Sequence, residues 1–336
     1  HYQNKKTILI ANKSWADLAR QLCLWDEVVS VNVAEFRKNF RYRWTIFKEM
    51  RGLGIETAVH PVHMCHLTTG DTVIRISNAN TRIGSKGDIT SKMKGWQKWL
   101  ANGWYNQLIP SSNENTNIFD KNDEFTKYLT RSQEKENFFY LPKLKVNVDN
   151  LAPTQKYFLI FPGSNGTYKM WPKERFASLA QSIYSKTKYI PVVCGSHLEN
   201  ELCRSIVNSV EGAINLAGKT SISQVVELIR KAEFVVGNDS ASVHIAAATN
   251  TISFCILGGG HYGIFMPYPK NRFTHTPIVL NFKMPCYGCG WRCEFALSEK
   301  HAFPCVASVS EEKVMNAIME YLDNVPTNTE SVPQAL

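Results

Sequence analysis

The sequence contains no uninterrupted apolar run of the length that a membrane-spanning helix needs, which is about 20 residues. Its start, HYQNKKTILIAN, lacks both the long apolar core and the small-residue cleavage site of a secretion signal. The hydrophobic fraction of 44% and the charged fraction of 20% are typical of a globular protein. We therefore expect a cytoplasmic chain, soluble or peripheral to a membrane, and its 336 residues are enough for two domains.

Acidic residues are also in short supply. The 29 Asp and Glu residues are outnumbered by 38 Lys and Arg residues, and the net charge of +9 favours anionic partners such as phosphorylated sugars, nucleotides or lipid. No nucleic-acid-binding motif accompanies this charge, so nucleic acid is not an expected partner. No Asp-x-Asp pair follows an expected strand, so the sequence does not indicate a divalent cation held by carboxylates.

Basic residues gather at two places in the first half of the chain. The first group comprises Arg37, Lys38, Arg41, Arg43, Lys48 and Arg51, and the second comprises Lys86, Lys92, Lys94 and Lys98, interleaved with Trp96, Trp99 and Trp104. Indole and lysine side chains both suit the interface between water and acyl chains, so the second group is compatible with a membrane surface. The alternative is a solvated helix face packed by its tryptophans.

Expected strands and helices alternate along the whole chain. In the first half, strands are expected at 6–12, 27–31, 56–60 and 73–76 and a helix at 14–25, with polar loops at 111–122 and 131–137. In the second half, strands are expected at 157–161, 189–194 and 234–236, and helices at 172–186, 199–210, 221–231, 244–248 and 311–322. This rhythm predicts an α/β protein with two Rossmann-like domains, at 1–150 and 151–325, followed by a tail at 326–336.

The segment FVVGNDSASVHIAAAT, residues 234–249, is the first candidate for chemistry. It reads as an apolar strand, a turn, and then small residues at the start of a helix. Asp239, Ser240, Ala241 and Ser242 would let a pyrophosphate approach the amides at the helix N-terminus, and His244 follows one turn later. The alternative is that Asp239 and Ser240 only cap the helix.

The segment FPGSNGTYKMWP, residues 161–172, is the second candidate. A strand ends there in a glycine-rich turn before a helix that starts with proline. Ser164, Asn165 and Thr167 can donate hydrogen bonds to phosphate oxygens, and Lys169 can supply a positive charge. The alternative is a surface loop with a solvated lysine.

Four segments in this order and spacing resemble one known family. The stretches FPGSNGTYKMWPKERFASLA, VVCGSHLENELCRSI, INLAGKTSISQVVELIRKAEFVVGNDSASVHIAAAT and GGGHYGIFMPYP are similar to glycosyltransferase family 9, the ADP-heptose:lipopolysaccharide heptosyltransferases. The resemblance covers nearly the whole C-terminal half and is faint over the N-terminal half. It implies the GT-B fold, in which two Rossmann-like domains have parallel sheets that face a central cleft.

The resemblance also implies roles for individual residues. Ser164 and Asn165 would contact donor phosphate, Lys169 would help to hold the nucleotide, and Glu199 matches a glutamate near the adenosine ribose. Ser240 and Ala241 replace the Thr and Gly of the family's Asp-Thr-Gly-x-x-His motif. The expected donor-binding residues are Ser164, Asn165, Thr167, Lys169, Glu199, Asp239, Ser240, Ala241 and His244.

The general base is not identified by this comparison. Family members usually begin with a strand and a Gly-Asp loop whose aspartate is taken as the base, whereas this sequence opens on what looks like the family's second strand and helix. The chain is either a fragment or a departure from the family. Asp17, expected in a helix, and Asp71, expected in a loop, are the nearest carboxylates, and neither is favoured.

Nine cysteines remain to be explained. Cys23, Cys65, Cys194, Cys203 and Cys255 lie among apolar residues and are expected to be small buried side chains. Cys286, Cys289, Cys293 and Cys305 are spaced as in a structural zinc or iron site. A comparable cluster recurs in parts of the resembling family, including protein heptosyltransferases that carry iron. The alternative is free or partly paired thiols.

The sequence thus predicts an inverting, metal-independent glycosyltransferase. The resemblance implies an ADP-heptose-type donor and an anionic lipopolysaccharide-core glycan or glycolipid as acceptor. The second basic group is compatible with peripheral association with the inner membrane. The alternatives are a GT-B transferase with a different nucleotide sugar or a protein acceptor, a nucleotide-sugar epimerase, a donor-binding subunit without catalysis, and a zinc-module interaction protein.

Overall fold

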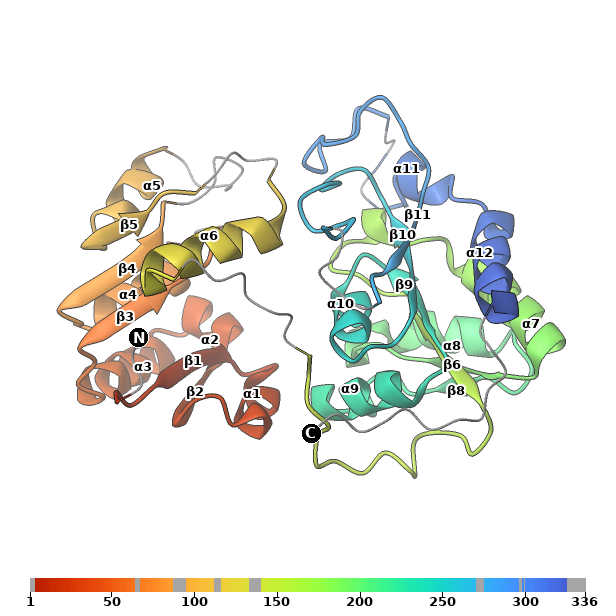
Figure 1. Cartoon of the computed structure of the whole chain (residues 1–336), viewed down its shortest axis with the longest axis horizontal. Coiled ribbons are helices and arrows are strands. Elements are labelled where there is room, and N and C mark those ends of the chain that lie inside the picture. The colour runs from red at the N-terminus through yellow and green to blue at the C-terminus, as the bar shows by residue number, and fades with distance from the viewer. Residues whose placement is uncertain are drawn as a thin grey trace. The chain divides into compact units, whose positions relative to one another are not determined.

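The computed structural model describes residues 4–63, 67–86, 95–111, 116–132, 140–269, 275–295, 298 and 300–324. The chain forms two compact units (Figure 1). Unit 1 is built from His1–Val146, Ser221–Val225 and His261–Phe273, and unit 2 from Asn147–Thr220, Val226–Gly260 and Thr274–Leu336.

Unit 1 contains two small parallel sheets. Strands β1 (Ile8–Asn12) and β2 (Glu27–Val31) pair with each other, and β3 (Thr57–His60), β4 (Thr81–Ser85) and β5 (Gln107–Ile109) form a second sheet in that order. The strands expected at 6–12, 27–31 and 56–60 are therefore confirmed. The helices are α1 (Ala16–Leu22), α2 (Val33–Lys38), α3 (Phe40–Gly52), α4 (Gly70–Ile76), α5 (Gly95–Asn102) and α6 (Ile118–Thr130).

The expectations for residues 73–76 and for Asp71 are wrong. Residues 73–76 are not a strand, because they end helix α4, which buries Ile74 and Ile76. A short apolar run fits a buried helix and a buried strand equally well, and here the strand β4 follows instead. Asp71 is consequently in the first turn of a helix, not in a loop.

The end of the expected loop at 111–122 is also helical. Residues 118–122 open α6, and the side chain of Asn117 caps that helix by accepting a hydrogen bond from the amide of Phe119 over 3.1 Å. Helix α6 buries Phe125 and also the side chain of Lys121. The expected loop at 131–137 lies largely outside the described residues, as does Cys65.

Unit 2 contains one six-stranded parallel sheet. Its strands are β6 (Tyr157–Phe161), β7 (Ile190–Val193), β8 (Ile214–Asn215), β9 (Val235–Asn238), β10 (Ser253–Leu257) and β11 (Ile278–Asn281), in the spatial order β11-β10-β9-β6-β7-β8. Every neighbouring pair is parallel. The expected Rossmann-like arrangement of this half is confirmed, although β8, β10 and β11 were not anticipated.

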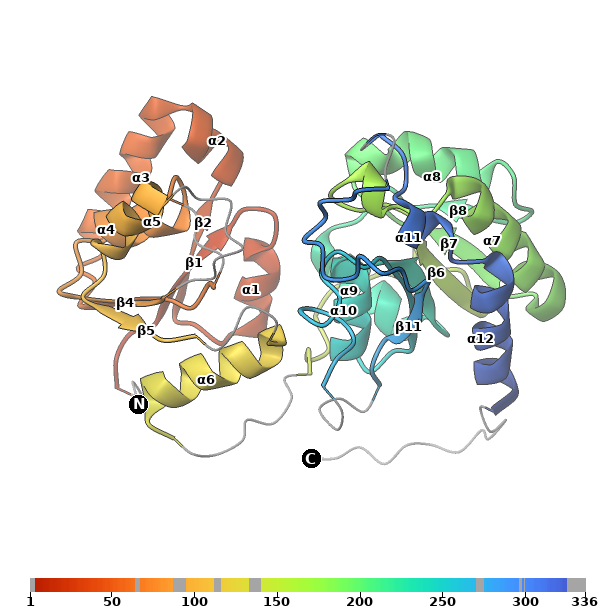
Figure 2. The same ribbon diagram turned by 90° about the horizontal axis from the view of Figure 1, so that it is seen from above.

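Helices cover both faces of this sheet (Figures 1 and 2). Helices α7 (Lys173–Thr187), α8 (Asn200–Val207) and α12 (Glu311–Asn324) lie on one face, and α9 (Ile222–Lys231) and α10 (Ala241–Ala248) lie on the other. The short helix α11 (Pro304–Ala307) precedes α12. Because both faces are covered, the central strands read as continuous apolar runs, such as the fully buried SFCIL of β10.

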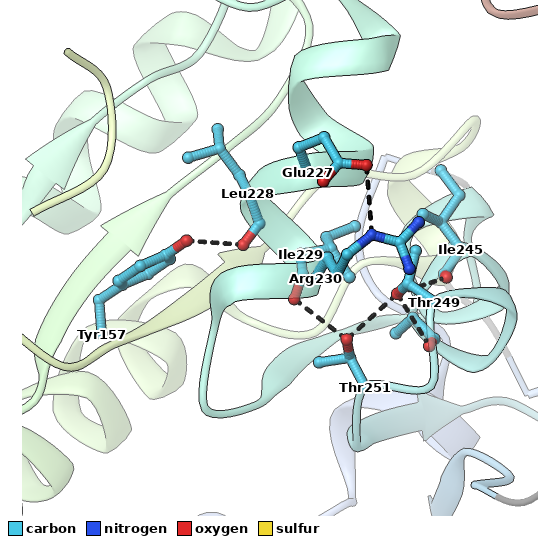
Figure 3. Close-up of polar contacts among 9 residues, drawn as sticks. Tyr157, Glu227, Leu228, Ile229, Arg230, Ile245, Thr249 and Thr251 are labelled. Carbon is cyan, nitrogen blue, oxygen red and sulfur yellow. Dashed lines mark hydrogen bonds and ion pairs between the residues drawn. The ribbon is translucent and has the colours of Figure 1, made fainter. Parts of the chain in front are cut away.

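Threonines on either side of one turn fix the helices on the second face to the sheet (Figure 3). The hydroxyl of Thr251 donates to the carbonyl oxygen of Ile229 in α9 over 3.1 Å and lies 3.1 Å from the hydroxyl of Thr249. Thr249 in turn donates to Ile245 in α10 over 3.0 Å. The ends of α9 and α10 are thus held at the start of β10, which sets where the opposite end of α10 lies.

No helix in the described part of the chain is both long and apolar enough to span a bilayer.

Candidate functional site

Three neighbouring strands of unit 2 end at one edge of its sheet. Strand β9 lies between β6 and β10, and all three run parallel. The segments that leave their carboxyl ends, 162–169, 239–241 and 258–260, therefore meet at that edge. In open α/β sheets this edge is where ligands bind.

The segment after β6 carries four of the expected donor-binding residues. Ser164 and Lys169 are half-buried, whereas Asn165 and Thr167 are exposed. The ammonium of Lys169 lies 4.6 Å from the centroid of the Trp291 ring. The lysine is therefore held against an aromatic face, which argues against the alternative of a fully solvated side chain.

The segment after β9 leads into helix α10. Ser240 is the N-cap residue, but in the described structure its hydroxyl makes no capping hydrogen bond to the helix backbone and instead lies 2.9 Å from the hydroxyl of Ser242. The Ser240 side chain therefore does not act as a conventional N-cap. Ala241 is exposed, so small groups surround the first amides of the helix. A helix N-terminus of this kind presents amide hydrogens and a positive dipole to an anion.

His244 lies one turn into the same helix. Its Nε2 atom is 3.9 Å from Oδ1 of Asp239. Burial lowers the pKa of His244 below its usual range, and the Asp239 carboxylate partly offsets that effect. The imidazole is therefore neutral near pH 7, so it can both donate and accept hydrogen bonds.

Asn238 joins these two segments and was missed by the sequence analysis. Its side chain is fully buried at the end of β9. The amide nitrogen donates to the carbonyl oxygen of Pro162 over 2.7 Å, and the amide oxygen accepts from the backbone nitrogen of Trp171 over 2.9 Å. The Gly-Asn dipeptide at a strand end was visible in the sequence, but the partners of the asparagine come from a segment some 70 residues earlier.

Glu199 lies in the turn that follows strand β7. Its carboxylate accepts a hydrogen bond from the amide of Ser196 over 2.6 Å, which completes a capping box at this turn. The same carboxylate lies directly against Gly163, where a methyl group would overlap it. The fold therefore places Glu199 beside the glycine-rich turn, and all nine expected donor-binding residues belong to unit 2. Their roles in donor binding stay predictions.

The two candidate bases lie in different surroundings in unit 1. Asp17 is exposed and pairs with Arg20 at 2.6 Å within helix α1. Asp71 is completely buried, and its Oδ1 atom accepts a hydrogen bond from the hydroxyl of Tyr105 over 2.6 Å. His60 contacts the same tyrosine hydroxyl at 2.9 Å. The catalytic residues remain unassigned.

The predicted zinc or iron site is not supported. Among the described residues, which include all four of these cysteines, no group of three or more cysteine, histidine or carboxylate side chains is arranged to hold a metal. Cys305 is buried in α11, where its sulfur accepts a hydrogen bond from the amide of Gly259, whereas the other three lie on a partly exposed loop. The spacing suited a metal, but the arrangement of these side chains does not support one. Cys23 also departs from expectation, because it is exposed.

Comparisons with known proteins agree with this reading of the chain. The family model described as glycosyltransferase family 9 (heptosyltransferase) matches residues 113–284, which is half of the chain. Lipopolysaccharide heptosyltransferase 3 of Escherichia coli (strain K12) is 25% identical over 132 residues, a match that spans 38% of this chain and 38% of the relative. Lipopolysaccharide heptosyltransferase 1 of Campylobacter coli is 25% identical over 257 residues and 71% of each chain.

Two solved structures show the fold over nearly the whole chain. The E. coli ADP-heptose LPS heptosyltransferase II superposes with a TM-score of 0.67 and 18% identity, covering 94% of this chain and 88% of that one. The family 9 glycosyl transferase of Veillonella parvula superposes with a TM-score of 0.69 and 16% identity, covering 94% and 87%. The fold is the predicted pair of Rossmann-like domains of the GT-B class. The chain belongs to glycosyltransferase family 9.

Proposed function

We propose that this chain is an inverting glycosyltransferase that transfers heptose from an ADP-heptose-type donor to a hydroxyl of a lipopolysaccharide-core or other surface glycan. The observation that carries the proposal is the meeting of two segments at one sheet edge, the turn that ends in Lys169 and the segment that leads from Asp239 into α10. The named relatives that act in lipopolysaccharide assembly support the choice of donor and acceptor.

In this proposal the donor diphosphate lies between the amides of α10 and the ammonium of Lys169. The acceptor oxygen attacks the anomeric carbon of the sugar while the bond from that carbon to the phosphate oxygen breaks. Negative charge grows on the departing diphosphate, and the helix dipole and the lysine stabilise it. Ser164 and Asn165 donate hydrogen bonds to phosphate, and Glu199 binds the ribose. The acceptor proton passes to a base that is not yet assigned.

The acceptor is proposed to bind unit 1. The first basic group lies on helices α2 and α3, which run from Val33 to Gly52 and carry six of the chain's cations. Clustered positive charge raises the local concentration of an anionic, phosphorylated glycan. Added salt should therefore weaken acceptor binding more than donor binding.

Helix α5 supports a proposed peripheral contact with the inner membrane. Trp96 and Trp99 are 61% and 78% exposed, and Trp99 and Leu100 follow Trp96 by three and four positions, so all three lie on one side of the helix. Exposed indoles on one helix face suit the lipid interface. Sedimentation with vesicles that contain anionic lipid tests this, and a Trp96→Ala/Trp99→Ala double variant should lose the association.

The donor assignment is tested by calorimetric titration with ADP, UDP and ADP-heptose. We expect selective binding of the adenine nucleotides by the wild type and loss of that binding in Asp239→Ala, because Asp239 matches the donor-binding aspartate that the resemblance to the family implies. Asp323→Ala, at an exposed position in α12, is the matched control and should bind like the wild type.

The alternatives predict other results. Preference for UDP would indicate a GT-B transferase with a different nucleotide sugar. A chain that binds ADP-heptose, but neither transfers the heptose to lipopolysaccharide-core or protein acceptors nor hydrolyses the donor, would be a donor-binding subunit without catalysis. A folded wild type that binds neither nucleotide would contradict the donor proposal.

A further inference from the structure

The cysteine-containing loop at 286–293 packs against the end of strand β10. The amide of Gly288 donates to the carbonyl oxygen of Gly259 over 2.8 Å, and the amide of Gly290 donates to Gly260 over 2.9 Å. These two bonds fasten the loop to the segment 258–260, which leaves the same sheet edge as the expected donor-binding segments. The loop is therefore part of that edge and not a separate module.

The ring of Trp291 fills the space that this glycine segment leaves open. A methyl group on Gly260 would overlap the indole, and one on Gly258 would come within 2.8 Å of it. The ring also lies 5.4 Å from the ring of Tyr168, which belongs to the turn after β6. Trp291 thus touches two of the three segments that meet at the edge.

The backbone of Trp291 adopts a conformation that bulky residues avoid. Its φ angle is +65°, in the left-handed region, and the glycines at 288 and 290 have φ angles of +86° and +59°. Glycine would occupy position 291 without strain, whereas a side chain with a Cβ atom is disfavoured there. Strain of this kind persists where the surrounding structure demands the side chain, and it concentrates at functional sites.

The indole of Trp291 holds the one lysine that the donor site is proposed to use. The Nζ atom of Lys169 lies 4.6 Å from the indole centroid, within the range of a cation–π interaction, and 5.9 Å from the ring of Tyr168. Lysine has a flexible stem, so an unrestrained ammonium would sample many positions. Contact with tryptophan, the strongest aromatic partner for a cation, favours positions over the ring.

We propose that Trp291 is a positioning residue of the donor site, whose indole holds the Lys169 ammonium in place for the diphosphate of a nucleotide. The inference rests on the proposed donor site and extends it to the cysteine-containing loop. The part of the ligand that Trp291 affects is the diphosphate, because the positively charged Lys169 is the group that would contact it. The affinity for the nucleoside alone should not depend on Trp291.

The test compares Trp291→Gly, which removes the ring and relieves the backbone, with Trp291→Phe, which keeps a weaker aromatic face. Calorimetry with ADP and with inorganic pyrophosphate should show binding weakened about 3- to 30-fold in Trp291→Gly and less in Trp291→Phe, as expected for loss of a cation–π contact. Binding of adenosine, followed by ligand-observed NMR, should be unchanged. A purely structural role would weaken adenosine and ADP equally, and that result overturns the proposal.

A donor-independent readout is the reactivity of Lys169 towards acetic anhydride, measured by mass spectrometry of its peptide. We expect faster acetylation in Trp291→Gly, relative to the exposed Lys173, because the ring no longer shields the amine. Tyr184→Leu is the matched control. It removes a similar pair, in which Lys188 lies 5.4 Å from the Tyr184 ring, and it should change neither Lys169 reactivity nor ADP affinity.

The remaining outcomes separate this inference from the donor proposal. If the wild type prefers UDP and Trp291→Gly weakens UDP binding, the ADP-heptose assignment fails and the role of Trp291 stands. If Trp291→Gly binds ADP as tightly as the wild type or more tightly, the inference is overturned and the donor proposal stands. If folded wild type binds none of these diphosphates, both are overturned. Should Trp291→Gly not fold, the intermediate weakening expected for Trp291→Phe decides the question.

Discussion

The side-chain amide of Asn238 donates a hydrogen bond to the carbonyl oxygen of Pro162 over 2.7 Å, and so ties the end of β9 to the end of β6. The same side chain accepts from the backbone amide of Trp171 over 2.9 Å. One buried residue therefore sets the spacing between the turn that carries Lys169 and the helix that starts at Ala241.

Replacing Asn238 by Asp should destabilise unit 2. The carboxylate would keep the bond from Trp171 but would face the carbonyl oxygen of Pro162 with an acceptor in place of a donor. Leaving buried acceptors unsatisfied lowers the free energy of unfolding by about 1–3 kcal/mol, and more for a charged group. Urea denaturation measures this, with Asn208→Asp at an exposed position as the control. Equal stability of the two variants would contradict the assignment.

Gly163→Ala should be destabilising because of Glu199. The new methyl group would overlap the Glu199 carboxylate, which the amide of Ser196 holds in place over 2.6 Å. Removing that carboxylate should relieve the overlap. The double variant Gly163→Ala/Glu199→Ala should therefore lose less stability than the sum of the losses in the two single variants. We expect a coupling of about 0.5–3 kcal/mol in a double-mutant cycle of thermal unfolding. Additive effects would show that the glutamate moves aside freely.

His60 should make stability depend on pH. Burial lowers the pKa of His60 below the ordinary value of 6.5, and Asp71, whose Oδ1 atom is 3.7 Å away, partly offsets this. Below pH 6.5 the unfolded chain binds the proton more readily than the folded chain, so the stability present above pH 6.5 is lost as the pH falls through that value.

Urea denaturation at pH 7.5 and 5.5 checks this prediction. The variant His60→Gln, which cannot take up a proton, should lose less stability between these two pH values than the wild type. His244 contributes in the same direction, so part of the dependence should remain. His301→Gln, at an exposed position, is the control. A His60→Gln variant with the full wild-type loss would refute the assignment.

The thiols should react in an order set by burial. Cys194, Cys203 and Cys255 are buried, and burial raises the pKa of Cys203 to about 12 and raises the pKa values of Cys194 and Cys255 well above their usual range. Iodoacetamide at pH 8, followed by mass spectrometry, should therefore modify the partly exposed Cys289 and Cys293 long before these three. Modification of Cys289 and Cys293 only after treatment with a chelator would show that a metal protects them.

Much of unit 2 could be predicted from local sequence. Buried parallel strands are short apolar runs, and the helices between them have an apolar face at helical spacing, so β6, α7 and α9 were expected close to their observed bounds. Turn residues at strand ends, such as those around Gly163 and Ser240, are equally local signals. The family followed from the order of those signals along the chain.

The sequence by itself thus determined the α/β class, the two Rossmann-like halves and the segments that carry Lys169 and Asp239. It could not decide residues 73–76, because a short apolar run is buried equally well in a helix, and packing against neighbouring elements makes the choice. Asn238 and Trp291 were assigned only by the tertiary structure, since the Pro162 carbonyl and the Lys169 ammonium come from distant parts of the chain. The metal expected at the four cysteines is not supported, because spacing along the chain gives only the separation of the thiols, whereas folding decides how their side chains are arranged.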